Sequence, residues 1–260
     1  MLLNTMIARS FFLFWSILFS AGLLAAMPDV GVKEMLGKGI PLETSFLDHT
    51  GRKVQLKDYF HGKPVILSLA YYGCPMLCNL VTTGIKDGIN GVPYELGKDY
   101  EVVSLSFDPE DTPEIAAKFR NKYVSSLRNP KTGSGWHFLT GAPDSVKLVA
   151  DAVGFQYKRD KKTGEFAHGA VIIVLMPDGK VSRYLYGIEF KPIDLKLSLI
   201  EAKNKKVIST VEHVMLFCYN YDPNARGYVL VAQNVMKIGA FITLLVLGGT
   251  LLILHLKKRN

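Results

Sequence analysis

The chain has 260 residues, a net charge of +8 and 48% hydrophobic residues, which suits one folded domain with a substantial core. Its basic residues are scattered in small groups, such as Lys158–Arg159 and Lys203 to Lys206, which we interpret as solvated loop and helix surface. This distribution argues against a nucleic-acid partner. Three cysteines are an odd number and exclude a fully paired disulfide scaffold, so we expect thiols that are kept for chemistry.

The first 26 residues have the pattern of an export segment. Arg9 precedes an apolar stretch, residues 11–26, that closes on small side chains. Such a segment predicts a signal peptide over residues 1–26. The alternative is an uncleaved N-terminal anchor, because Leu24 would occupy the −3 position of a cut after Ala26, where signal peptidases prefer a small residue.

The other end of the chain predicts a membrane span. Residues 236–256 are almost entirely apolar or small, and the basic residues Lys257, Lys258 and Arg259 follow at once. Positive charge collects on the cytoplasmic side of a span, so we expect residues 257–260 to form a cytoplasmic tail. The globular part would then lie on the periplasmic side of a bacterial inner membrane. The alternative, a buried core helix, is disfavoured because Gly248 and Gly249 weaken soluble helices but are common in membrane ones.

Between these segments, residues 27–210 predict a single α/β domain. Strands alternate with helices before a final hairpin, which implies a parallel sheet with right-handed crossovers that ends in an antiparallel pair. We therefore expect a thioredoxin-like mixed β-sheet flanked by helices. In chain order the expected elements are a hairpin at 46–54, strands at 65–71, 101–107, 136–140, 170–176 and 181–185, and helices at 75–90, 112–124, 143–153 and 192–202.

Two cysteines stand where the first long strand passes into a helix. Cys74 and Cys78 follow the apolar run 65–72, and their four-residue spacing on a helix places both sulfurs on one face. Amide groups at the start of a helix favour a thiolate over a thiol. Paired thiolates at such a place suit either soft-metal binding or disulfide exchange. Met76 between them could approach a metal, but we expect it to pack beneath the helix start.

His168 is expected to approach the two thiols from another strand. If strand 170–176 runs antiparallel to strand 65–71, its beginning lies beside the end of the first strand. Two sulfurs and one imidazole nitrogen can hold copper, since thiolates prefer Cu(I) and imidazole supports Cu(II). Zinc with a water as fourth ligand would also accept this set. The simpler alternative is that His168 caps the strand or bonds to a carbonyl group.

The chain resembles the Sco/SenC family in four blocks that occur in the family's order: residues 67–78, 103–113, 138–141 and 167–179. The resemblance implies a thioredoxin fold, copper bound by Cys74, Cys78 and His168, and assistance in building the dinuclear copper centre of cytochrome c oxidase. It also draws attention to Asp108, which would lie near the site at a strand's carboxyl end or, as we favour slightly, cap a turn.

The chain departs from many family members in having the C-terminal span and the preceding juxtamembrane segment, residues 211–235. His213, Met215 and Cys218 in this segment could form a second soft-metal or relay site. The aromatic residues around them equally suit packing at a membrane interface, and we favour that interpretation.

Three functions are compatible with these features. The first is a membrane-tethered metallochaperone that accepts copper from other copper chaperones and passes it, from exposed thiolates, to the copper-bearing subunit of cytochrome c oxidase. The second is a thiol-disulfide oxidoreductase, with Cys74 and Cys78 as catalytic residues, that keeps the cysteines of the oxidase copper site reduced. The third is a thiol peroxidase of the same fold, which leaves His168 unexplained.

Overall fold

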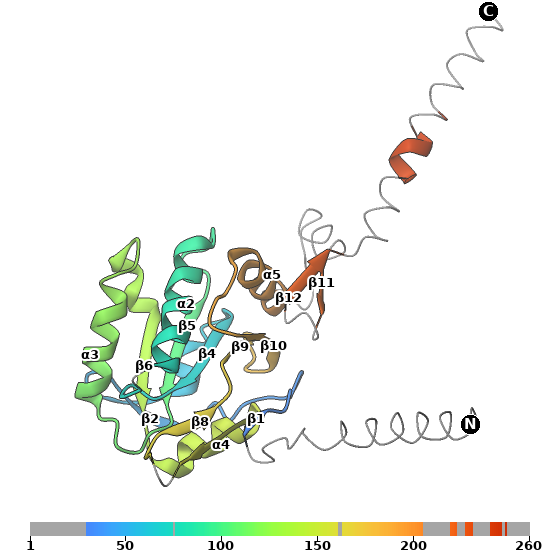
Figure 1. Cartoon of the computed structure of the whole chain (residues 1–260). Helices are drawn as coiled ribbons and strands as arrows, with labels where there is room; N and C mark the ends of the chain where they lie inside the picture. Colours follow the sequence, from blue (N-terminus) through green and yellow to red (C-terminus); the bar gives the residue numbers. More distant parts are fainter. Residues whose placement is uncertain are drawn as a thin grey trace, which may run out of the picture.

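The computed structural model describes residues 30–74, 76–160, 163–204, 219–222, 227–230, 240–245 and 248. Its main feature is a seven-stranded sheet with the order β10-β9-β4-β5-β6-β2-β3 (Figure 1). In chain order these strands are β2 (Ser45–Asp48), β3 (Lys53–Gln55), β4 (Val65–Ala70), β5 (Glu101–Ser106), β6 (Trp136–Thr140), β9 (Val171–Leu175) and β10 (Val181–Tyr186).

The centre of the sheet is parallel and its margins are antiparallel. β4 pairs in parallel with β5, and β5 with β6, while β9 runs antiparallel to β4 and β2 antiparallel to β6. All residues of β4 and β5 are buried, as expected for strands covered on both faces. The expected mixed, thioredoxin-like sheet is therefore confirmed, including the antiparallel pairing that brings the start of β9 to the end of β4.

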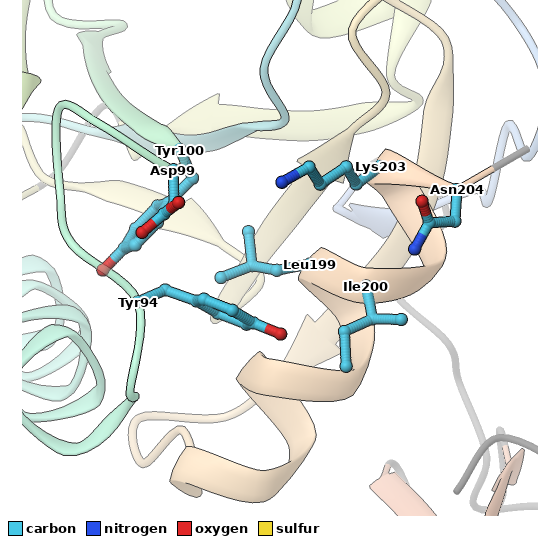
Figure 2. A pocket seen from close by; sticks show the side chains of 7 residues that line it. All are labelled: Tyr94, Asp99, Tyr100, Leu199, Ile200, Lys203 and Asn204. Atoms are coloured by element: carbon cyan, nitrogen blue, oxygen red, sulfur yellow. The ribbon is translucent and has the colours of Figure 1, made fainter. Parts of the chain in front are cut away.

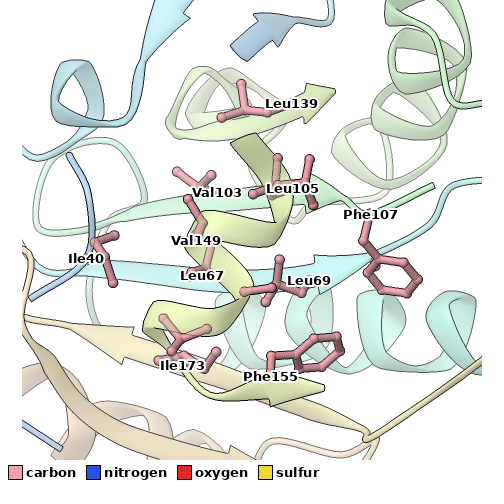
Figure 3. Close-up of a cluster of buried hydrophobic side chains, with 14 of the residues drawn as sticks. Ile40, Leu67, Leu69, Val103, Leu105, Phe107, Leu139, Val149, Phe155 and Ile173 are labelled. Carbon is pink, nitrogen blue, oxygen red and sulfur yellow. The ribbon is translucent and has the colours of Figure 1, made fainter. Parts of the chain in front are cut away.

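Helices cover both faces of this sheet. On one face lie α2 (Leu77–Gly91), α3 (Pro113–Val124) and α5 (Pro192–Lys203), whose apolar residues pack on Ile66, Val102 and their neighbours. On the other face lies α4 (Pro143–Ala152), with Val149 over Leu67 and Leu105 (Figure 3). Alternate residues of each strand thus enter two separate cores. Two short 3-10 helices, η1 (Leu56–Tyr59) and η2 (Pro130–Gly135), complete the domain.

A second, three-stranded sheet lies beside α4 and was not predicted. It consists of β1 (Gly31–Val32), β7 (Phe155–Arg159) and β8 (Phe166–His168), with β7 in the middle. Lys158 and Arg159 are therefore strand residues with exposed side chains, and their interpretation as loop or helix surface was wrong. His168 is the last residue of β8 and pairs with Tyr157.

The terminal predictions fall largely on residues that the structure does not describe. The signal or anchor segment 1–26 lies outside the described residues, and so does most of the predicted span 236–256. Among the residues that are described, no helix is long and apolar enough to cross a membrane. Within the expected juxtamembrane segment, β11 (Tyr219–Asp222) and β12 (Gly227–Leu230) form an antiparallel hairpin.

Candidate metal and thiol site

The two thiols lie at the carboxyl end of β4, where the chain turns into α2. After Ala70 the backbone bends, and the Cys74 amide donates to the Tyr71 carbonyl across 3.4 Å. α2 begins at Leu77, two residues later than predicted, so Cys78 stands in its first turn. Both cysteines are free, but they are also buried, with Cys74 6% and Cys78 0% exposed. The expectation of exposed thiolates was therefore wrong.

The sulfur of Cys74 is surrounded by hydrogen-bond donors. The amide of Cys78 donates to it across 3.4 Å, and the Tyr71 hydroxyl and the Met76 amide also reach it. Burial raises the pKa of the Cys74 thiol, but these donors outweigh burial, and its pKa lies below the ordinary value. The helix start thus favours the thiolate at Cys74, as the sequence predicted.

Cys78 has the opposite character, so the prediction that the helix start favours a thiolate was wrong for this residue. Burial raises the pKa of its thiol far above the ordinary value, although the Tyr71 amide donates to the sulfur across 3.4 Å. The neighbouring charge of Cys74 raises the pKa further. Within the pair, the pKa is therefore lowered at Cys74 and raised at Cys78.

His168 reaches Cys78 from β8. Its Nε2 atom is 3.3 Å from the Cys78 sulfur, and its Nδ1 atom is 3.0 Å from the Gly169 carbonyl oxygen. Because a carbonyl oxygen can only accept, Nδ1 carries the proton of the neutral ring and the lone pair of Nε2 faces the sulfur. Burial lowers the pKa of His168, so the ring remains neutral to a lower pH than an exposed histidine.

Aromatic rings enclose the imidazole. The ring centroids of Phe107, Phe155 and Tyr71 lie 5.2, 5.9 and 6.4 Å from that of His168. Phe166 closes the group, with its ring 5.3 Å from that of Phe107. Such an apolar surround limits the access of water and holds the ring orientation. The sequence analysis did not anticipate this group, because its members come from four separate elements or loops.

Two acidic residues follow β5, and the structure separates their roles. The Asp108 carboxylate accepts the Glu110 amide across 3.0 Å, so it caps a turn, which is the alternative that we favoured. Asp111, which the sequence analysis missed, accepts the Tyr72 amide across 2.7 Å and the Ser106 hydroxyl across 2.5 Å. Asp111 therefore ties the loop after β5 to the chain that carries Cys74.

Met76 does not pack beneath the helix start as predicted. It is the residue directly before α2, and it is 69% exposed. His213, Met215 and Cys218, for which we considered a second site, lie outside the described residues.

The three candidate ligands are chemically suited to a soft metal, but they are not gathered around one point. Cys78 is hydrogen-bonded to Cys74 and contacts His168, so the three side chains form a chain with Cys78 in the middle. Within the part of the chain that the structure describes, no three His, Cys, Asp or Glu side chains are gathered closely enough to hold an ion as they stand. Binding by these three residues thus requires movement of at least one of them. Two sulfurs and one nitrogen are the donors that copper prefers.

Two cavities lie away from the thiols. One of about 150 Å³ is lined by Tyr100, just before β5, and by Lys203 at the end of α5 (Figure 2). Another, of about 290 Å³, is lined by Asp111 and by Thr140 at the end of β6. No predicted site residue lines either cavity, so the candidate site is the thiol and imidazole group itself.

Comparison with known proteins identifies the family of the chain. A family model described as SCO1/SenC matches residues 40–199, which is more than half of the chain. A SCO1 protein homolog of Bacillus subtilis strain 168 is 28% identical over 153 residues, covering 58% of this chain and 75% of that protein.

Solved structures share the fold. The crystal structure of a candidate electron transfer protein from Aquifex aeolicus VF5 is 28% identical and has a TM-score of 0.59, covering 66% of this chain and 96% of that one. A SCO1/SenC family lipoprotein from Bacillus anthracis strain Ames is 24% identical with a TM-score of 0.51, covering 60% of this chain and 89% of that one. The match of the family model across the thioredoxin-like domain shows that the chain belongs to the SCO1/SenC family.

Proposed function

We propose that this protein is a copper metallochaperone that carries its metal on Cys74, Cys78 and His168. The observation that carries the proposal is the 3.3 Å contact between the Cys78 sulfur and the unprotonated Nε2 atom of His168. A soft thiol beside a neutral imidazole, with a second thiol hydrogen-bonded to the first, provides the donors for copper in both oxidation states.

Each residue has a distinct part in handling the copper. The Cys74 thiolate is the donor that is ready to bind, while the Cys78 thiol must release its proton to water when it binds. The Gly169 carbonyl holds the imidazole with its free nitrogen toward the metal. Because three ligands leave copper with a low coordination number, a partner's ligand can enter and replace them one at a time.

The family resemblance suggests the recipient. We propose that the copper passes to the copper-bearing subunit of cytochrome c oxidase and is supplied by other copper chaperones. The predicted C-terminal span would hold the domain on the periplasmic side of a bacterial inner membrane. This tether rests on the apolar stretch 236–256 and the basic residues that follow it.

The proposal is tested by metal binding to the purified full-length chain. We expect the wild-type protein to retain about one copper per chain under anaerobic dialysis, with a sulfur-to-copper charge-transfer band in the Cu(II) form. His168→Ala should weaken Cu(II) binding about a hundredfold and Cu(I) binding much less, because Cu(I) is satisfied by sulfur donors.

His61→Asn is the matched control for this loss of an imidazole. His61 is exposed and has a φ of 34°, a conformation that asparagine tolerates. This variant should bind both ions as the wild type does. A wild-type protein that loses its copper on dialysis, or equal losses for the two ions in His168→Ala, would overturn the assignment.

The unequal thiols favour a second candidate, a thiol-disulfide oxidoreductase. The Cys74 thiolate would attack a target disulfide, forming a mixed disulfide and releasing one target thiolate. Cys78 would then lose its proton and resolve the mixed disulfide, leaving a Cys74–Cys78 disulfide and a reduced target. Another dithiol must reduce that disulfide before the next cycle. Such an activity would keep the cysteines of the recipient site reduced, so the two roles are compatible.

A further inference from the structure

The sulfur atoms of the domain are unequally exposed. Cys74 and Cys78 are buried, and Met35 and Met176 are partly buried. Met76 is 69% exposed, and among the described residues it is the sulfur-containing side chain that is exposed to solvent. A donor protein that approaches the site therefore finds the thioether of Met76 in solvent, whereas Cys74 is largely covered and Cys78 fully covered.

The backbone of Met76 is already in contact with the site. It stands two residues from Cys74, its amide helps to lower the pKa of the Cys74 thiol, and it directly precedes α2, whose first turn carries Cys78. Its side chain is unbranched and rotates about three bonds, so the thioether can turn between solvent and the neighbouring sulfur. A thioether is a soft, uncharged ligand that suits Cu(I) and binds it more weakly than a thiolate does.

We propose that Met76 is the entry ligand of the site, which receives Cu(I) from an external donor and passes it to Cys74. The inference rests on the proposed copper function and adds a residue to it. A bond between copper and the Met76 sulfur forms as one bond to the donor breaks, and the Cys74 thiolate then replaces Met76. Cys78 gives its proton to water as it binds, and copper remains Cu(I) throughout, so no electron is transferred.

This role explains how buried thiols exchange a metal. A weak ligand at the surface lowers the barrier to transfer without changing the final bound state, in which Met76 has been released. The same residue would serve on the way out, when a recipient's ligand takes the metal. Because thioethers favour Cu(I) over Cu(II), the entry step also selects the reduced ion.

The test measures the rate of metal uptake separately from affinity. The full-length chain is mixed with the Cu(I) complex of bicinchoninate, and loss of the complex's absorbance gives the rate of transfer. Met76→Leu keeps the size and apolar character of the side chain and removes the sulfur. We expect uptake to slow about tenfold in this variant, with the equilibrium affinity for Cu(I) unchanged.

Leu80→Ala is the control for changing an exposed apolar side chain near the start of α2. Leu80 is 43% exposed and lies one turn further along α2. Its variant should load copper at the wild-type rate. Uptake by Met76→Leu at the wild-type rate would overturn the inference while leaving the copper function intact. A fall in affinity as large as the fall in rate would also overturn it, since Met76 would then hold the metal permanently. A wild-type chain that takes up no copper would remove the proposed function itself.

Discussion

At the scale of single residues, the hydroxyl of Tyr71 is the side-chain contact from outside the thiol pair that helps to distinguish the two thiols. It donates to Cys74, while the amide of the same residue donates to Cys78. A hydrogen bond to a charged sulfur is stronger than one to a neutral sulfur, so the hydroxyl stabilises the Cys74 thiolate. The pKa of Cys74 is therefore lowered in part by one aromatic side chain that lies outside the metal-binding candidates.

Replacing Tyr71 with Phe should raise the pKa of Cys74. The thiolate loses a donor, so the curve of alkylation rate against pH should move to higher pH, and the rate at neutral pH should fall about tenfold. Alkylation of each cysteine by iodoacetamide, followed by mass spectrometry, measures this directly. Tyr157→Phe is the control, because the Tyr157 ring belongs to the same aromatic group and stacks on Phe107 with a 4.6 Å centroid distance.

The alkylation curves of the wild-type protein and of Tyr71→Phe would coincide if the Tyr71 hydroxyl did not stabilise the thiolate. The same measurement bears on the oxidoreductase candidate, which requires Cys74 to react before Cys78. Preferential alkylation of Cys78 in the wild-type protein would argue against that candidate.

The sequence was sufficient to predict the three metal-binding candidates but not their surroundings. Cys74 and Cys78 are marked by a local spacing, and His168 by its place before a strand whose pairing follows from topology. No spacing or position in the sequence identifies the Tyr71 hydroxyl, Asp111 or the aromatic group. Their roles depend on side-chain packing between elements that are distant in the sequence.

At the scale of elements, the position of α2 depends on a close approach at Gly84. A Cβ atom built there would lie 2.1 Å from the carbonyl oxygen of Ile188 and 3.3 Å from the side chain of Phe190. The helix backbone therefore lies directly against the loop that follows β10. Since α2 carries Cys78 in its first turn, this contact also helps to set the place of the thiol.

Gly84→Ala should destabilise the protein despite the better helix propensity of alanine. The contact is with backbone, which cannot rotate away, so α2 or the loop must shift, and we expect a loss of about 2 kcal/mol in the free energy of unfolding. Urea denaturation measures it. Gly39→Ala, where a Cβ atom would have nothing within 4 Å, should change the free energy by less than about 0.5 kcal/mol. Equal stabilities of the two variants would contradict the steric account.

The long elements were predicted to within one or two residues, whereas the small sheet was missed. Continuous apolar runs such as β4 and β9 are typical of strands buried on both faces. β1, β7 and β8 have two to five residues and are partly exposed, and β1 pairs with a strand more than 100 residues away. Such pairing is decided by the packing of the domain and leaves little periodic signal.

At the scale of the whole molecule, the predicted C-terminal span determines on which side of the membrane the thiols lie. If the basic residues 257–259 remain in the cytoplasm, the domain and its thiols lie on the opposite side of the membrane. A reporter fused after Asn260 tests this. Green fluorescent protein should fluoresce there and alkaline phosphatase should be inactive, because each requires its own compartment to fold.

Charge reversal provides the matched variant. Replacing Lys257, Lys258 and Arg259 with Glu removes the positive charge that orients the span, so a fraction of the chains should show active phosphatase. An active phosphatase fused to the wild-type chain would contradict the proposed orientation. Recovery of the wild-type chain in the soluble fraction would contradict the tether itself.

His168 and the two cysteines are positioned by different sheets, and this division has a consequence for how the protein can be altered. The cysteines follow β4 of the seven-stranded sheet, with Cys78 in the first turn of α2, whereas His168 is the last residue of β8 in the three-stranded sheet. On the proposed function, the sulfurs confer the capacity to hold copper and the nitrogen confers tolerance of its oxidised form. The affinity for copper and the preference for one of its oxidation states thus depend on different parts of the fold. Exchanging residues 155–168, which include β7 and β8, between relatives would change the tolerance of Cu(II). The two cysteines, and with them the capacity to bind copper, would remain in place.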